Sequence, residues 1–354
     1  MEAGGLPASR IALMRSTTSG SIVGGRPKRT PSARFVSRAA SISNSRTMNL
    51  RCEDGRWSIE GLTDDERELK RHWVEALPRY LDIIDPLFLR AQEAGEFDFI
   101  NSLIPIRGLR DAGWDAWKSS KDALMAMTPL INETKDWTTR RHLKLWAWGH
   151  TVEASEPYEL LRNLIEVAGG GRFHIEWFPD VPVKGGRKRP QHPMDKINQI
   201  ASAGKNAGLD RIADPLNEIW ETDLRNAVFH ADYALHGADV RLPKVARNLE
   251  HETIEALAAR AAAYIEAIVI LHDHYIGEYT EPKLISAGGF APGEKAWVMV
   301  REGQGAAGLR HALTAHDIAH GGIQWCLGLF TPDENAMLNA DPMLVKLPRR
   351  LAPD

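Results

Sequence analysis

An arginine, an asparagine and a histidine stand close together in residues 224–233, which read LRNAVFHADY. Asn226 and His230 are four residues apart, so they share one face if this segment is helical. Arg225 lies beside that face, and its long side chain can swing toward it. A guanidinium binds phosphate oxygens through its planar fork, and histidine exchanges a proton near neutral pH. These three residues therefore predict a site for phosphodiester chemistry.

RNA carries its own nucleophile for such chemistry, the 2′-hydroxyl group. A site can cleave RNA without a metal ion if a base takes the hydroxyl proton and a cation stabilises the charged phosphorane. The sequence near Arg225 shows no convincing carboxylate cluster for two metal ions, which agrees with this mechanism. We therefore expect neither a metal nor a cofactor at this site.

The same residues also have a purely structural interpretation. Arg225 would then form an ion pair with Asp223 or Glu221 on its own helix. His230 would stabilise the negative end of the helix dipole. The sequence alone leaves the two interpretations open.

Three helices are expected to position the motif. Apolar residues recur every three or four positions over 138–168, 209–230 and 253–276. Pro157 is a point at which the first helix could break in two, and the glycines at 169–171 should end it. A shorter helix is expected over residues 195–205, and a hairpin turn at His236-Gly237.

The motif resembles the R-x4-6-H signature of HEPN domains, which often begins with Arg-Asn, as Arg225-Asn226 does here. The surroundings are similar too: a long helix, a variable loop, a short helix, the motif helix and a long final helix. The resemblance covers residues 138–276 and implies a mainly α protein with a HEPN-like helical bundle. It also implies a homodimer that places two copies of the motif across its interface.

What the resemblance implies about activity is a metal-independent endoribonuclease with a defence or toxin role. Arg225 and His230 would be catalytic, and Asn226 would position one of them. In one toxin subgroup a tyrosine lies two residues after the histidine, whereas Tyr233 lies three after His230, so that subgroup's regulation is not expected. Some HEPN domains are inactive, so the alternative is a non-catalytic RNA- or protein-binding module.

A compact basic cluster lies in the expected loop or short strand over residues 172–193. It is interpreted either as a solvated loop or as a loop that contacts RNA phosphates. Its members are Lys184, Arg187, Lys188 and Arg189.

A second histidine pair could bind zinc. His316 and His320 are four residues apart, with His311 and Cys326 nearby. However, an aspartate stands where a zincin has its glutamate base, and two glycines follow at once. We therefore expect a cluster at the end of a helix and no metal.

The remaining segments are expected to have different characters. Residues 1–47 hold eight arginines and lysines and one acidic residue, and they are rich in Ser, Gly and Ala. We expect a disordered basic leader there, with three interpretations: a transit peptide, a nucleic-acid-binding arm, or a misassigned start before Met48. Residues 60–137 should form a helical region of unknown role, and residues 278–354 a small α+β unit.

The composition excludes several classes of protein. The 354 residues include only two cysteines, which excludes a disulfide framework and fits a reducing compartment. The net charge of −3 argues against coating nucleic acid by bulk charge. No apolar run reaches the roughly 18 residues that a membrane span needs. We expect a cytoplasmic protein with no membrane partner, and with RNA and a second copy of the chain as partners.

Overall fold

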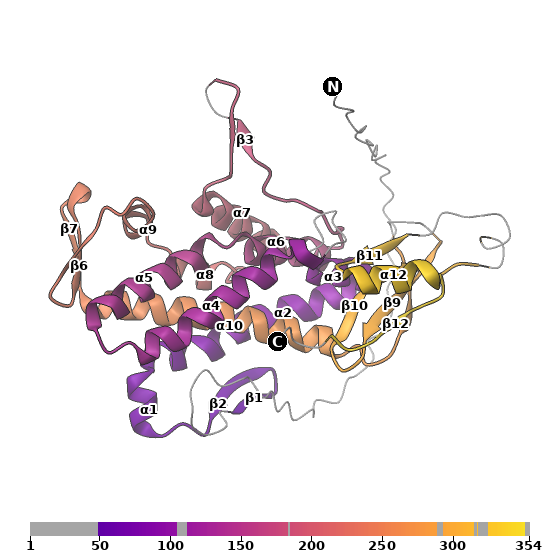
Figure 1. Ribbon diagram of the computed structural model, residues 1–354, viewed down its shortest axis with the longest axis horizontal. Coiled ribbons are helices and arrows are strands. Elements are labelled where there is room, and N and C mark those ends of the chain that lie inside the picture. Colours follow the sequence, from indigo (N-terminus) through magenta and orange to yellow (C-terminus); the bar gives the residue numbers. More distant parts are fainter. Residues whose placement is uncertain are drawn as a thin grey trace. The chain divides into compact units, whose positions relative to one another are not determined.

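The computed structural model describes residues 49–104, 112–182, 185–288, 293–314, 317 and 325–350. The expected leader, residues 1–47, lies outside the described residues. The described chain is mainly α-helical, with a small sheet near its C-terminus (Figure 1). The α-helices are α1 (Asp64–Leu69), α2 (Arg71–Ala94), α3 (Glu96–Leu103), α4 (Ala116–Glu133), α5 (Trp137–Glu153), α6 (Ser155–Ala168), α7 (Pro193–Asn206), α8 (Asp214–Ile219), α9 (Thr222–Phe229), α10 (His251–Gly277) and α12 (Pro332–Ala340).

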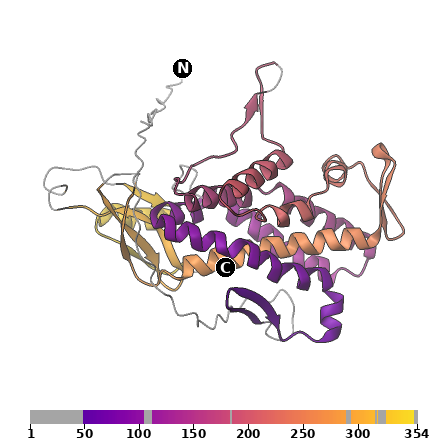
Figure 2. The ribbon, with the colours of Figure 1, turned by 180° about the vertical axis from the view of Figure 1, so that it is seen from behind.

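Helices α2 and α10 are the centre of the hydrophobic core and run side by side in Figures 1 and 2. Helix α6 packs on α2, and α5 and α8 pack on α10. Helix α2 continues through Pro78 and Pro86, although proline usually interrupts or kinks a helix. Tight packing of its apolar face accounts for this, because the lost hydrogen bonds are offset by burial. Fully buried members of the core include Leu77, Tyr80, Leu81, Ile84, Ile268 and Leu271.

The start of helix α1 agrees with its sequence. The Thr63 hydroxyl accepts a hydrogen bond from the Glu66 amide, and the Glu66 carboxylate accepts one from the Thr63 amide. This is the reciprocal capping box that their spacing predicts.

The expected long helix over residues 138–168 is two helices, α5 and α6. The break falls at Ala154, whose backbone leaves the helical conformation at ψ 118°, and not at Pro157. Pro157 lies within the first turn of α6, where a missing amide hydrogen costs no helical hydrogen bond.

The expected helix over residues 209–230 is also two helices, α8 and α9, so that prediction is wrong. The buried indole of Trp148, on α5, donates a hydrogen bond of 2.9 Å to the Ile219 carbonyl. Trp220 then adopts an extended backbone, at ψ 128°. The Glu221 carboxylate accepts from the Asp223 amide and caps α9. A long-range contact therefore breaks a helix whose apolar spacing alone predicts continuity.

In the described part of the chain, four sheets accompany the helices. Their strands are β1 (Asn49–Glu53), β2 (Arg56–Glu60), β3 (Val181–Pro182), β4 (Lys188–Arg189), β5 (Ala234–His236), β6 (Asp239–Leu242), β7 (Arg247–Leu249), β8 (Lys283–Ser286), β9 (Lys295–Arg301), β10 (Gly305–His311), β11 (Cys326–Gly328) and β12 (Lys346–Leu347). Strands β1–β2, β3–β4 and β5–β6–β7 form antiparallel sheets, and Gly237, at φ +57°, makes the expected turn after β5.

The C-terminal strands form the fourth sheet, in the order β11-β10-β9-β12, with β8 also paired to β9. Its pairs are antiparallel except for β12, which runs parallel to β9. Helix α12 belongs to the same region, and a small cluster that includes Met299, Phe330 and Leu338 fills the space between them. This agrees with the α+β character expected for residues 278–354.

The main hydrophobic cluster runs across the expected boundaries at 137 and 277. It includes Leu50 of β1, Leu77 of α2, Leu161 of α6, Leu271 of α10 and Leu309 of β10. In the described part of the chain, no helix is both long and apolar enough to cross a membrane.

Candidate functional site

Helix α9 carries the predicted catalytic residues. Arg225 and Asn226 lie in its middle turns, and His230 is the residue that caps its C-terminal end. The buried Leu224, Ala227 and Val228 face the core, which turns the polar residues toward the surface. The structure therefore places the three predicted residues along one short, partly exposed helix.

Arg225 is held in place by residues on two helices. Its Nε donates to Glu153 Oε1 at the end of α5, forming an ion pair whose arginine side chain is 20% exposed. Its Nη1 donates to Asn226 Oδ1 at 3.1 Å, and its Cζ lies 5.3 Å from the centre of the Phe229 ring. These contacts fix the guanidinium, and a cation over an aromatic face adds a further favourable interaction.

His230 is exposed at the end of α9, and its backbone amide donates to the Asn226 carbonyl at 3.0 Å. Within the described chain its imidazole makes no hydrogen bond, and no contact joins it to the Arg225 guanidinium. This position agrees with the helix-dipole role of the structural interpretation. It also leaves the ring accessible to a substrate or to another copy of the chain.

The structural interpretation is wrong about the partner of Arg225. Both carboxylates that were candidate partners of Arg225, those of Glu221 and Asp223, instead form ion pairs with Arg247 on β7. Its Nη1 donates to Glu221 at 2.9 Å and to Asp223 at 3.1 Å. This pairing ties the start of α9 to the small β5–β6–β7 sheet and leaves Arg225 to Glu153.

Aromatic side chains surround the motif. Phe229 is 50% exposed beside Arg225, and Trp146 on α5 is 54% exposed. The Tyr233 hydroxyl lies 2.7 Å from His142 Nδ1. His142 is on α5, one helical turn before Trp146. Burial raises the pKa of Tyr233, and a hydrogen bond with Trp146 opposes that shift. We call this group of residues the α9 surface. Its members are Glu153, Arg225, Asn226, Phe229 and His230, with the neighbouring His142, Trp146 and Tyr233.

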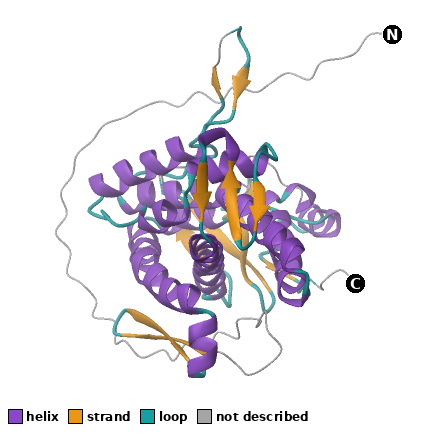
Figure 3. Ribbon diagram, turned by 90° about the vertical axis from the view of Figure 1, so that its left-hand side faces the viewer, coloured by secondary structure: helices purple, strands orange, loops and turns teal. Residues whose placement is uncertain are grey.

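The predicted RNA-binding cluster lies on a separate element. Arg187, Lys188 and Arg189 are exposed on the β3–β4 hairpin, which projects from the helices in Figures 1 and 3. Lys184 lies outside the described residues. Among the described residues, no hydrogen bond or ion pair joins this hairpin to α9. The structure therefore does not bring the two predicted groups into contact.

The alternative zinc site is described only in part. His316 and His320 lie outside the described residues. His311 is buried, stacks on Trp325 with ring centres 5.4 Å apart, and lies 3.2 Å from a Glu294 oxygen. Over the described positions, no group of three or more His, Cys, Asp or Glu side chains is placed to hold a metal ion.

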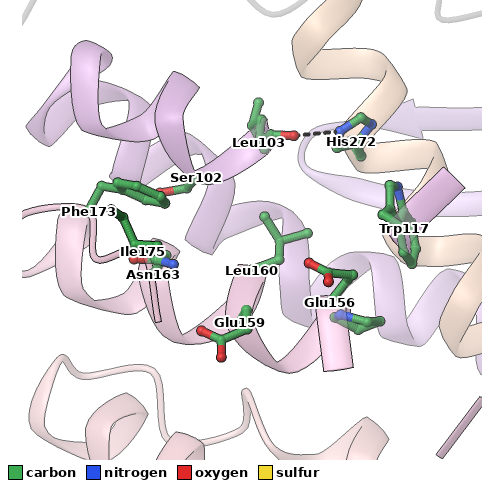
Figure 4. Close-up of a pocket in the computed structure, with 11 residues that line it drawn as sticks. Ser102, Leu103, Trp117, Glu156, Glu159, Leu160, Asn163, Phe173, Ile175 and His272 are labelled. Atoms are coloured by element: carbon green, nitrogen blue, oxygen red, sulfur yellow. Dashed lines mark hydrogen bonds between the residues drawn. The ribbon is translucent and has the colours of Figure 1, made fainter. Parts of the chain in front are cut away.

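A small, partly open pocket lies between α3, α4, α6 and α10 (Figure 4). His272 closes one side, with Nε2 2.9 Å from the Leu103 carbonyl oxygen. The cavity volume of about 30 Å³ is close to that of one water molecule in liquid water. It is therefore too small for a substrate.

Comparisons with protein-family models, with curated protein sequences and with solved structures find no match to this chain. The candidate site therefore rests on its own residues and geometry. Sequence reasoning missed Glu153, because it lies 72 residues from Arg225. The contact between Phe229 and Arg225 could have been predicted, because residues four positions apart on a helix are neighbours on its surface.

Proposed function

We propose that this protein is a metal-independent endoribonuclease of HEPN type that acts at the α9 surface. One observation carries the proposal: an accessible histidine and a guanidinium fixed by a carboxylate lie on one short helix. The resemblance of residues 138–276 to HEPN domains supports the same reaction.

In this reaction Arg225 binds the non-bridging oxygens of the scissile phosphate. The imidazole of His230 takes the proton of the 2′-hydroxyl, or gives a proton to the leaving group. The 2′-oxygen forms a bond to phosphorus, and the bond from phosphorus to the 5′-oxygen breaks. The products are a 2′,3′-cyclic phosphate and a 5′-hydroxyl group, with no change in oxidation state.

A homodimer is part of the proposal because the motif in one chain contains a single histidine, whereas the reaction needs a base and an acid. A second copy of the chain supplies the other imidazole. The exposed rings of Phe229 and Trp146 support this, because apolar rings on a surface favour contact with a partner or stacking on a base.

The experiment is cleavage of a mixed RNA pool in EDTA by the wild type, Arg225→Ala and His230→Ala. We expect each substitution to reduce the rate by about a hundredfold or more, since each removes a group that acts in the transition state. Matched controls are Arg211→Ala and His236→Ala, which remove exposed side chains elsewhere. Circular dichroism checks that every variant is folded.

Cleavage that survives both substitutions would show that the α9 surface is not the catalytic site. Dependence on Mg²⁺ would contradict the metal-independent mechanism, and a 2′,3′-cyclic phosphate product would support it.

The second candidate function is a non-catalytic RNA- or protein-binding module. The observation that favours it is the engagement of Arg225, which already contacts Glu153, Asn226 and Phe229. A wild type that binds RNA in the same assay and never cuts it, with binding lost in Arg225→Ala, would favour this function.

A further inference from the structure

A large open cleft lies at the other end of α5, away from Glu153. It has a volume of about 740 Å³, within the range of sites that bind small molecules. Its walls come from the end of α1, from the N-terminal parts of α2, α5 and α10, and from the turn between β5 and β6. The lining residues are Glu68, Leu69, Lys70, Arg71, His72, Trp137, Arg140, Arg141, Lys144, Gly237, Ala238, His251, Glu252, Glu255 and Ala259.

The cleft is positively charged, although the whole chain has a net charge of −3. Five lysine and arginine side chains line it against three glutamates. Glu255 pairs with Arg141 and Lys144, and Glu252 pairs with Arg71. Among the described residues, Lys70 and Arg140 form no salt bridge, and the Arg140 guanidinium donates only to the neutral Thr134 carbonyl. The excess positive charge therefore comes from these two side chains.

Polar groups that favour an anion come from the backbone as well. Helices α2, α5 and α10 all begin at the cleft, and each contributes residues of its first turn to the lining. Each helix start carries a partial positive charge.

The cleft is separate from the α9 surface. On one side of α5, Arg141 and Lys144 form ion pairs with Glu255 of α10. On the other side, Glu153 forms an ion pair with Arg225 of α9, and Gly149 lies against Phe229. At 3.6 residues per turn, these two sets lie on roughly opposite sides of α5. A ligand in the cleft therefore would not contact the residues proposed to cleave RNA.

We propose that this cleft binds a small, multiply charged phosphate anion. Lys70 and Arg140 provide the uncompensated charge. The Arg71 guanidinium can also bind a phosphate oxygen if its ion pair with Glu252 is released. Trp137 lines the cleft and is 47% exposed, so it offers an aromatic face to any organic group attached to the phosphates. The anion can thus be an inorganic polyphosphate or a nucleoside polyphosphate.

The test is isothermal titration calorimetry of the full chain with sodium tripolyphosphate at low ionic strength. We expect the wild type to bind, and Lys70→Glu to weaken binding by about tenfold or more, because the substitution reverses a charge inside the cleft. Arg140→Gln should also weaken binding. It serves as the second variant if Lys70→Glu fails to fold.

The matched control is Lys205→Glu, which makes the same charge change at an exposed position in the last turn of α7. It should bind tripolyphosphate as the wild type does. Absence of binding by the folded wild type would overturn the proposal. Equal weakening by Lys205→Glu would also overturn it, since a general effect of net charge would then explain the result.

A parallel titration with ATP distinguishes the two sources of phosphate. Tighter binding of ATP than of tripolyphosphate, lost in Trp137→Ala, would support a nucleoside polyphosphate as the ligand. Equal affinities would support recognition of the phosphates alone. The proposal does not depend on RNA cleavage, so a protein that cuts no RNA can still confirm it.

Discussion

The two sides of helix α5 handle charge in different ways. On the side toward α10, five cations and three glutamates surround a cleft, and the cations are in excess. On the side toward α9, one arginine is matched by one carboxylate and covered by an aromatic ring. The first arrangement leaves charge available to a mobile anion, whereas the second fixes one guanidinium at one position.

This difference fits two different functions, binding of an anion and catalysis. Binding by bulk attraction needs uncompensated charge and tolerates several geometries. Catalysis needs a charge that is already oriented before the substrate arrives, because that lowers the cost of reorganisation. The variants below change one side of α5 at a time, so each can break or sharpen the comparison.

The largest expected effect concerns Glu266, a half-buried carboxyl group on α10. Burial raises the pKa of Glu266 from 4.5 to about 7, although a hydrogen bond from Trp73 and the charge of Lys70 oppose the shift. Between these pH values the folded protein keeps a proton that the unfolded chain has lost. Its free energy of unfolding should therefore fall as the pH rises from 4.5 through 7, by about 3 kcal/mol.

Urea denaturation of the wild type and Glu266→Gln at pH 5 and pH 8 measures this effect. The wild type should lose about 3 kcal/mol more than the variant over this range. Glu93→Gln, an exposed position on α2, is the control and should behave as the wild type does. Equal pH dependence in the wild type and Glu266→Gln would contradict the prediction.

The next effect is on the α9 side. Glu153→Gln keeps the shape of the side chain and removes the charge that orients Arg225. We expect kcat for RNA cleavage to fall by about tenfold, the size expected for one charge-assisted hydrogen bond. KM should change much less, since the phosphate still meets the guanidinium.

Steady-state kinetics on a defined RNA separate the two parameters for Glu153→Gln. A change confined to KM would show that Glu153 acts on binding alone, and would weaken the contrast between the two sides of α5. Glu176→Gln, an exposed carboxylate after α6, is the matched control.

The smallest effect comes from Gly149, where α5 and α9 approach closely. A Cβ atom there would lie 3.3 Å from the Phe229 ring and 3.5 Å from Val228. Gly149→Ala should displace the ring and slow cleavage about twofold, because the cation–π contact with Arg225 is worth about 0.5–1 kcal/mol. Gly277→Ala is the control, since a Cβ there meets nothing within 4 Å. An unchanged rate would show that the Phe229 ring does not orient Arg225.

The helices differ in how far the sequence could predict them. The capping box of Thr63 and Glu66 is local, so the spacing of these two residues is enough to predict it. The helix α10 was also predicted, because its apolar residues recur over many turns. The break between α8 and α9 was missed, since it depends on the indole of Trp148, 71 residues from Ile219.

The two sites differ in the same way. Arg225, Asn226 and His230 could be selected because they lie within six consecutive residues. The cleft could not, because its walls come from the end of α1, the starts of α2, α5 and α10, and the β5–β6 turn, and these segments are spread along the chain. Spacing along one helix is visible in a sequence, whereas the meeting of three helix starts depends on the packed core.

The projecting β3–β4 hairpin has a practical consequence. A protease that cuts at Arg187, Lys188 or Arg189 divides the chain between α6 and α7. Helices α2 and α10 come from opposite sides of that cut, yet they pack against each other in the core. The two fragments should therefore stay associated, which makes the hairpin a suitable position to insert a tag or to split the protein into two complementing halves.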